Sequence, residues 1–173
     1  MERAAATGTV TPSLSTATRF AADAMLGRLA RWLRVLGYDT WYDIAVADPV
    51  LVEIAHAEDR VLLTRDRLLL HDLRPARAHE VRQDQPLEQL RDLVLALQLR
   101  APGELFTRCL LDNAPLQPVP PEEAEPLLPD GVRGLPGPVR RCPVCLRLYW
   151  DGSHVRRMRA ALDRTLPGWL PPA

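Results

Sequence analysis

Short apolar runs alternate with stretches of helical periodicity through the first part of this chain. Residues 19–23, 40–42 and 60–64 are mostly apolar or β-branched and are expected to form strands, with a further strand near residues 79–82. Strands that alternate with helices at this spacing are typical of a parallel sheet that carries helices on its faces. The sequence therefore predicts an α/β core with about four parallel strands.

The helical stretches between these runs carry leucine and alanine at spacings of three and four residues. The first covers residues 25–36, and Gly37 is expected to end it. The second is expected to begin with Asp48 as the N-cap and Pro49 as the first helical residue. A long amphipathic helix is expected from Pro86 onward.

The character of the sequence changes after residue 104. Eight prolines between residues 113 and 141 interrupt any long element, so we expect a loop-rich module there. The predicted organisation is a disordered leader over residues 1–18, an α/β core over 19–104, and the module with a C-terminal helix over 105–173.

Length and composition exclude several classes of protein. The chain has 173 residues, and no apolar run approaches the roughly 18 residues of a membrane-spanning helix. The first residues lack the apolar region of a secretory signal, and three cysteines are too few for a disulfide scaffold. We therefore expect a cytoplasmic protein with no membrane partner.

The formal net charge of zero hides a division along the chain. Residues 1–38 carry +3, residues 39–132 carry −9 and residues 133–173 carry +6. An acidic middle between basic ends fits a carboxylate-rich site with basic flanks, and an accident of surface composition is the alternative. All 22 basic residues are arginine, so a single arginine is weak evidence for phosphate binding.

Three aspartates, Asp23, Asp43 and Asp66, follow the expected strands. Ligands of open parallel sheets bind beyond the carboxyl ends of the strands, and Mg²⁺ prefers oxygen ligands. Such a metal can polarise a phosphoryl oxygen and activate a water molecule. Each aspartate can instead cap the helix that follows it, so both interpretations stay open.

Four runs, RFAADAMLGRLARWLRVLGYDT, RVLLTRD, RCPVC and LYWDGSHVRRM, carry a family resemblance over residues 19–165. The sequence resembles the PIN-like ribonuclease family named for the C-terminal domain of the Mut-seven exonucleases. The resemblance implies a PIN-like nuclease core, Mg²⁺- or Mn²⁺-dependent hydrolysis of RNA phosphodiester bonds, and a C-terminal zinc ribbon. It matches Asp23 and Asp66 to the family's acids, with Asp43 as the third choice. Acids that stay open as substitutes or as a further ligand are Asp48, Glu53, Asp72, Glu80 and Asp84.

The cysteines point to a second, structural metal site. Cys142 and Cys145 form a C-x-x-C turn of the kind that supplies two zinc ligands. The resemblance places the other pair at Cys109 and at position 112, where this chain has Asp112. The site is then either a Cys₃Asp zinc site or a metal-free cluster of thiols, and His154 is a further candidate ligand.

Basic residues at both ends are candidates for binding single-stranded RNA. The expected RNA-contacting residues are Arg28, Arg31, His154, Arg156, Arg157 and Arg159. Arginine binds phosphate, whereas exposed helical arginines are also common without a ligand. Trp150 is expected to pack the module against the core rather than to stack on a base.

The leading hypothesis is a metal-dependent ribonuclease. A non-catalytic RNA- or protein-binding module on the same PIN-like scaffold is the alternative from another class. An unrelated α/β phosphohydrolase is disfavoured because the sequence has no glycine-rich phosphate-binding loop.

Overall fold

A parallel sheet of four strands forms the core of the computed structural model, which describes residues 18–133 and 137–170. Its strand order is β2-β1-β3-β4, with every neighbouring pair parallel. The strands are β1 (Phe20–Ala22), β2 (Thr40–Tyr42), β3 (Val61–Thr64) and β4 (Ala78–Glu80). The predicted α/β class is therefore confirmed. The predicted leader lies outside the described residues except for residue 18.

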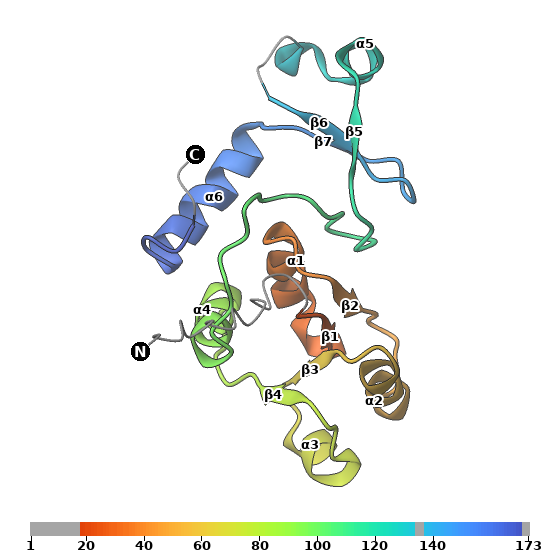
Figure 1. Ribbon diagram of the computed structural model, residues 1–173, viewed down its shortest axis with the longest axis vertical. Coiled ribbons are helices and arrows are strands. Elements are labelled where there is room, and N and C mark those ends of the chain that lie inside the picture. The colour runs from red at the N-terminus through yellow and green to blue at the C-terminus, as the bar shows by residue number, and fades with distance from the viewer. Residues whose placement is uncertain (1–17, 134–136, 171–173) are drawn as a thin grey trace, which may run out of the picture.

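Helices cover both faces of the sheet (Figure 1). On one face lie α1 (Gly27–Val35), preceded by the 3₁₀ turn Ala24–Leu26, then α4 (Pro86–Ala96) and α6 (Ser153–Thr165). On the other face lie α2 (Asp48–Ala57) and α3 (Arg67–Leu73). Among the described residues, no helix is long and apolar enough to cross a membrane.

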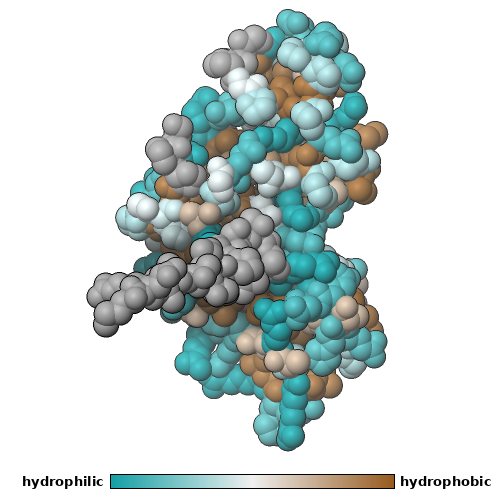
Figure 2. Space-filling view, viewed as in Figure 1, coloured by the Kyte–Doolittle hydropathy of each residue, from teal (hydrophilic) through white to brown (hydrophobic). Residues whose placement is uncertain are grey.

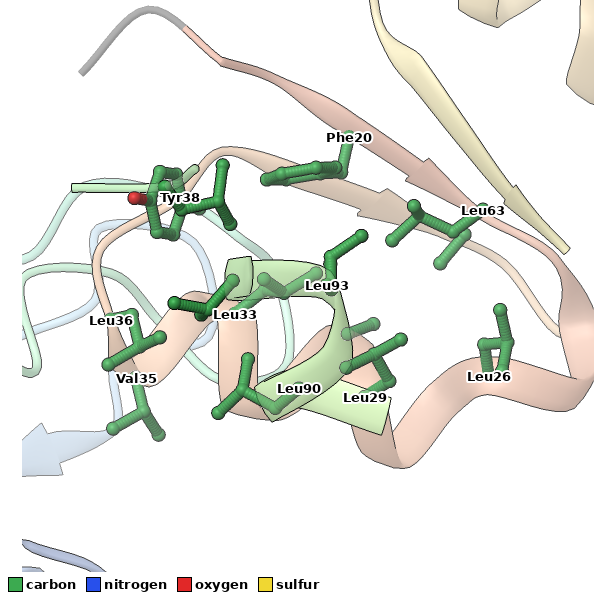
Figure 3. Packing of buried hydrophobic residues seen from close by; sticks show 14 of the residues in the cluster. Phe20, Leu26, Leu29, Leu33, Val35, Leu36, Tyr38, Leu63, Leu90 and Leu93 are labelled. Atoms are coloured by element: carbon green, nitrogen blue, oxygen red, sulfur yellow. The ribbon is translucent and has the colours of Figure 1, made fainter. Parts of the chain in front are cut away.

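Both faces of the sheet are apolar because β1 and β3 are continuous apolar runs whose side chains point alternately to the two faces. Phe20 and Leu63 point to the α1 and α4 side, where they meet leucines such as Leu33 and Leu93 (Figure 3). Ala21, one residue after Phe20, belongs to the cluster on the α2 side. Burial of each large side chain contributes roughly 1.5–3 kcal/mol, so this core dominates the stability of the fold.

The sequence correctly predicted the residue that ends α1 but not the residue that caps the start of α2. Gly37 ends α1 as predicted, with φ of +83°, and the Tyr38 N–H donates to the Leu33 carbonyl in a Schellman pattern. The prediction for Asp48 was wrong: the N-cap of α2 is Ala47, and Asp48 is already helical. A carboxylate in the first turn still interacts favourably with the helix dipole.

A charged network ties the amino-terminal ends of the strands together. Arg60 is 5% exposed and donates to Asp39 at 2.7 Å and to Glu58 at 2.7 Å. Asn113, from the C-terminal module, also donates to Asp39 at 2.7 Å. Burial raises the pKa of Asp39, but the hydrogen bonds from Arg60 and Asn113 more than offset this and lower it to about 2.

Asp39 is expected to make the protein sensitive to acid. Its folded pKa lies below the ordinary value of 3.8, so its contribution is complete above that pH and is lost as the pH falls towards 2. Asp39→Asn should lower the free energy of unfolding by about 2 kcal/mol at pH 7 and should remove part of the acid dependence. Urea unfolding at pH 7 and pH 3 measures this effect.

The matched control is Asp130→Asn, which removes an exposed carboxylate paired with Arg133. Exposed pairs contribute little, so this variant should unfold like the native protein at both pH values. Equal acid dependence in Asp39→Asn and the native protein would contradict the role given to Asp39.

The C-terminal module is a small antiparallel sheet with its own apolar cluster. Its strands, in the order β5-β6-β7, are β5 (Gln117–Val119), β6 (Val139–Arg141) and β7 (Leu148–Tyr149). Short helical segments follow β5 at Pro121–Ala124 (α5), Glu125–Leu127 and Asp130–Val132. In the view of Figure 2, hydrophobic residues of the module and of the core show at the surface as separate patches among hydrophilic residues.

Arg34 of α1 connects the start of this module to the core through hydrogen bonds. The side chain is 3% exposed. Its guanidinium donates to the Thr40 carbonyl at 2.9 Å and to the carbonyls of Leu110 and Leu111 at 2.9 Å and 2.7 Å. The bonds to Leu110 and Leu111 join segments more than seventy residues apart.

Arg34→Leu is expected to lower the free energy of unfolding by about 3 kcal/mol, because buried carbonyls that lose their donor cost about 1–3 kcal/mol each. Arg31→Leu, three residues earlier on the same helix and exposed, is the control and should change stability by less than about 0.5 kcal/mol. Thermal unfolding of both variants checks this prediction, which fails if they melt together.

Candidate active site and metal centre

The carboxyl ends of the parallel strands bring the predicted acids to one edge of the sheet. Asp23 follows β1, Asp43 follows β2, and Asp66 lies two residues beyond β3. Ala22 pairs with Tyr42 on one side and with Leu63 on the other, so the three strands end in register. This edge is where open α/β sheets bind ligands.

Asp23 and Asp66 are linked through the hydroxyl of Thr64. The Thr64 hydroxyl donates to Asp23 Oδ2 at 2.5 Å and accepts the backbone N–H of Asp66 at 2.9 Å. Asp23 is 6% exposed, and its Oδ1 accepts the N–H of Met25 at 2.7 Å. Asp66 also caps α3, since its Oδ1 accepts the N–H of Leu68 at 2.7 Å. Both aspartates therefore cap the helical segment that follows them and lie at the carboxyl edge of the sheet.

Asp43 is at this edge of the sheet but is not joined to the other two acids. It is exposed, and its Oδ1 accepts the N–H of Ala45 at 2.8 Å within its own turn. Among the described residues, Asp23, Asp43 and Asp66 are not among the side-chain groups that lie close enough together to hold a metal ion. The substitutes Asp48 and Glu53 are exposed on α2, and Asp72 is exposed and pairs with His71.

Two acids later in the sequence, Glu80 and Asp84, form ion pairs with arginines. Glu80, which pairs in register with Thr64, receives Arg67 at 2.8 Å and Arg82 at 3.0 Å. Hydrogen bonds from Arg82 and Arg67 lower the pKa of Glu80, so it stays ionised. Asp84 pairs with Arg65 at 2.6 Å.

A cleft of about 490 Å³ opens at this edge of the sheet. None of the three acids lines it directly, but residues next to each of them do: Ala24 and Met25, Tyr42, and Arg65. The other charged lining residues are Arg28, Arg31 and Asp84. The cleft therefore places arginines beside the carboxylates. Sequence reasoning left Asp84 open as a further ligand and missed Arg65, because the pairing of these two residues joins two loops.

Gly27 allows α1 to start close to β2. A Cβ at this position would lie 2.6 Å from the Tyr42 hydroxyl oxygen, which is too close for any side chain. The same hydroxyl donates to the Ala24 carbonyl at 3.1 Å. The backbone after Asp23 is thereby held against Tyr42, and this contact forms one wall of the cleft.

The second predicted cluster is assembled by the module. Ligand atoms of Cys109, Asp112, Cys142 and Cys145 all lie within 4.8 Å of one another, a set that can hold a metal ion such as zinc. The sulfur atoms of Cys109 and Cys145 are 3.7 Å apart, close to the edge of about 3.8 Å expected for two thiolates on tetrahedral zinc. Asp112 Oδ2 lies 3.3 Å from the sulfur of Cys142.

The two turns that carry these ligands have equivalent geometry. The N–H of Asn113 donates to the Cys109 carbonyl at 3.0 Å, and the N–H of Leu146 donates to the Cys142 carbonyl at 3.1 Å. Asn113 and Leu146 both have positive φ, 62° and 60°. Asp112 therefore occupies the place that Cys145 has in the second turn. His154 is not part of the cluster.

Hydrogen bonds in this cluster set the protonation of its ligands. Burial raises the pKa of Cys109, but the N–H of Asp112 and the hydroxyl of Tyr149 more than offset it and lower that pKa. Hydrogen bonds from the thiols of Cys145 and Cys142 lower the pKa of Asp112. The carboxylate of Asp112 in turn raises the pKa of Cys145 to about 12. Metal ions bind thiolates, so binding here releases protons.

A family model for the Mut7-C RNAse domain matches residues 18–162, which is most of the chain. The chain belongs to the Mut7-C RNAse domain family. No curated protein matches it, and no solved structure does. The expected resemblance is confirmed, and membership of the Mut7-C family indicates a ribonuclease-like function with RNA as the substrate.

The residues expected to contact RNA lie on two helices of the Mut7-C domain. Arg28 and Arg31 are exposed on α1 and line the cleft. His154, Arg156 and Arg157 are exposed in the first turns of α6. Arg156 donates to the Asp151 carbonyl at 3.3 Å. The α6 group does not line the cleft, so only the α1 arginines lie beside the acids.

Proposed function

We propose that this protein is a divalent-metal-dependent ribonuclease that hydrolyses RNA phosphodiester bonds at the carboxyl edge of the sheet. The observation that carries the proposal is the chain of contacts from Asp23 through the Thr64 hydroxyl to Asp66, beside a cleft lined by arginines. Membership of the Mut7-C family supports the same activity class.

Asp23 and Asp66 would hold the metal ion, with Asp43 as a third carboxylate from the neighbouring strand. Their oxygens suit Mg²⁺ or Mn²⁺, and the hydrogen bonds described above leave lone pairs on both carboxylates. When bound, such an ion polarises a phosphoryl oxygen and lowers the pKa of a coordinated water molecule.

The remaining residues of the site position the substrate. Thr64 orients the Asp23 carboxylate by its hydrogen bond, and Asp66 is fixed by its cap on α3. Arg28 and Arg31 on the wall of the cleft would bind phosphates of the RNA beside the bond to be cleaved. Without them, the acidic edge would repel a polyanion.

The cysteine cluster is proposed to bind structural zinc. A Cys₃Asp set has no open position for substrate, and closed tetrahedral sites stabilise a fold rather than act on a ligand. Arg34 contacts the carbonyls of Leu110 and Leu111 within the first turn, so zinc at this position would also brace the core.

Labelled single-stranded RNA, incubated with Mg²⁺ or Mn²⁺ and then with EDTA, tests the ribonuclease activity. We expect cleavage that needs the metal and stops on chelation. Binding that EDTA leaves unchanged, with no cleavage under any metal condition, would contradict the proposal. That result would favour a non-catalytic RNA-binding module on this scaffold.

A further inference from the structure

A groove of about 770 Å³ lies between α1 and the C-terminal module. Trp32 lines it from α1, and Tyr149 and Trp150 line it from the module. Arg28 and Arg31 line both this groove and the cleft at the sheet edge. The two hollows therefore adjoin each other at Arg28 and Arg31 of α1.

The charged residues that line the groove are all positive. Arg147 lines it together with Arg28 and Arg31, and none of its lining residues that the structure describes is acidic. None of these three arginines forms an ion pair with a described carboxylate, whereas Arg65 of the cleft is paired with Asp84. The groove thus presents cationic groups, which have no ion-pair partner among the described residues, around an aromatic interior.

The tryptophans that line the groove are held in place by packing against apolar clusters. Trp32 packs against the large core cluster, and Trp150 packs against the cluster of the module. Gly152 leaves room for the Trp150 indole, because a Cβ there would lie 2.8 Å from its Nε1 atom. Rigid aromatic surfaces lose little conformational entropy when a ligand stacks on them.

A ligand that fits this groove needs a flat apolar part and a negatively charged part. A nucleotide of single-stranded RNA has both, since bases stack on aromatic side chains and phosphates bind arginine. An apolar protein segment would desolvate the arginines without neutralising them. A base within a duplex is already stacked and paired, so it is not available to the groove.

We propose that the groove binds an unpaired nucleotide of single-stranded RNA, next to the phosphodiester bond that lies in the cleft. This inference rests on the proposed ribonuclease function and adds a substrate class to it. Because Arg28 and Arg31 belong to both hollows, the strand passes from the cleft over α1 into the groove. The enzyme accordingly selects single-stranded over double-stranded RNA.

Leucine substitutions of the two tryptophans test the groove in the full chain. Trp32→Leu and Trp150→Leu keep apolar bulk and remove the stacking surface. Binding of a short labelled single-stranded RNA is measured by fluorescence anisotropy in EDTA, which prevents metal-dependent cleavage. Each variant should bind about 10- to 100-fold more weakly, the range expected for losing one stacked base. The matched control is Trp41→Leu on the opposite face of the sheet, which should bind within about twofold of the native protein.

Arg147→Gln provides a variant that leaves the packing untouched, because Arg147 is exposed. It should weaken binding and lower the salt dependence of log K by a little under one unit. Arg100→Gln, exposed and outside the groove, should change neither quantity. A series of RNAs, each with one abasic position, locates the stacked base. The native protein should bind one member of the series more weakly than the others. Trp150→Leu should bind that RNA no more weakly than it binds the RNA with all its bases.

The outcomes separate this inference from the ribonuclease function. If Trp32→Leu, Trp150→Leu and Arg147→Gln all bind RNA with native affinity, the groove is not an RNA site, even if metal-dependent cleavage is seen. A protein segment would then be the remaining candidate ligand of the groove. Binding that depends on these residues but is never followed by cleavage would support the groove and overturn the nuclease. Equal affinity for duplex and single strand would also overturn the groove proposal.

Discussion

Asp23→Asn is expected to lower the rate of RNA cleavage about 10³-fold while the protein stays folded. A metal ion that stabilises the transition state contributes several kcal/mol, and a neutral amide holds such an ion poorly. The amide can still accept from Met25 N–H and can donate to the Thr64 hydroxyl oxygen, so the local hydrogen bonds survive. Initial rates at saturating RNA and Mn²⁺, with a thermal melt of the same preparation, measure the two effects separately.

Asp66→Asn should lose activity to a similar degree. Thr64→Val should lose less, because it removes the hydrogen bonds to Asp23 and to the Asp66 backbone but no carboxylate. Asp72→Asn is the matched control, since this carboxylate is exposed at the far end of α3 and pairs with His71. If Asp72→Asn loses as much cleavage activity as Asp23→Asn, the acids at the sheet edge have no particular role in cleavage. Asp43→Asn reports whether the third carboxylate is needed.

Cys142→Ser is expected to abolish zinc binding and to unfold the module. Structural zinc supplies on the order of 10 kcal/mol to small domains, more than this module's short strands and small apolar cluster provide by themselves. Elemental analysis of the purified native protein should give one zinc per chain, and the variant should give none. Hydrogen exchange should show loss of protection over residues 109–149 with the parallel sheet retained.

Asp112→Cys is the matched gain-of-ligand variant. Because the turn at Asp112 has the same geometry as the turn at Cys145, a thiolate at position 112 should complete a Cys₄ site and bind zinc more tightly. The control is Val144→Ser, an exposed position between the two cysteines of the second turn, which should leave zinc affinity unchanged. Weaker zinc binding in Asp112→Cys than in the native protein would contradict the assignment of Asp112 as a ligand.

Much of the fold could be read from the sequence because the signals are local. The continuous apolar runs of β1 and β3 and the leucine spacing of α1 identify surfaces that must be buried. The positive φ of Gly37 is a property of one residue and its helix end. The position of Asp23 and Asp66 after their strands follows from the same order of elements, since parallel strands present their carboxyl ends at one edge.

Only the tertiary structure decided which of these residues meet. The Thr64 hydroxyl joins Asp23 to Asp66 because β1 and β3 are hydrogen-bonded neighbours, although forty-one residues separate Asp23 from Thr64. The clamp of Arg34 on the first cysteine turn and the groove between α1 and the module join segments far apart in the chain. Periodicity and capping act over a few residues, whereas such contacts depend on how whole elements pack. Sequence patterns therefore placed the acids and cysteines, and packing determined their partners.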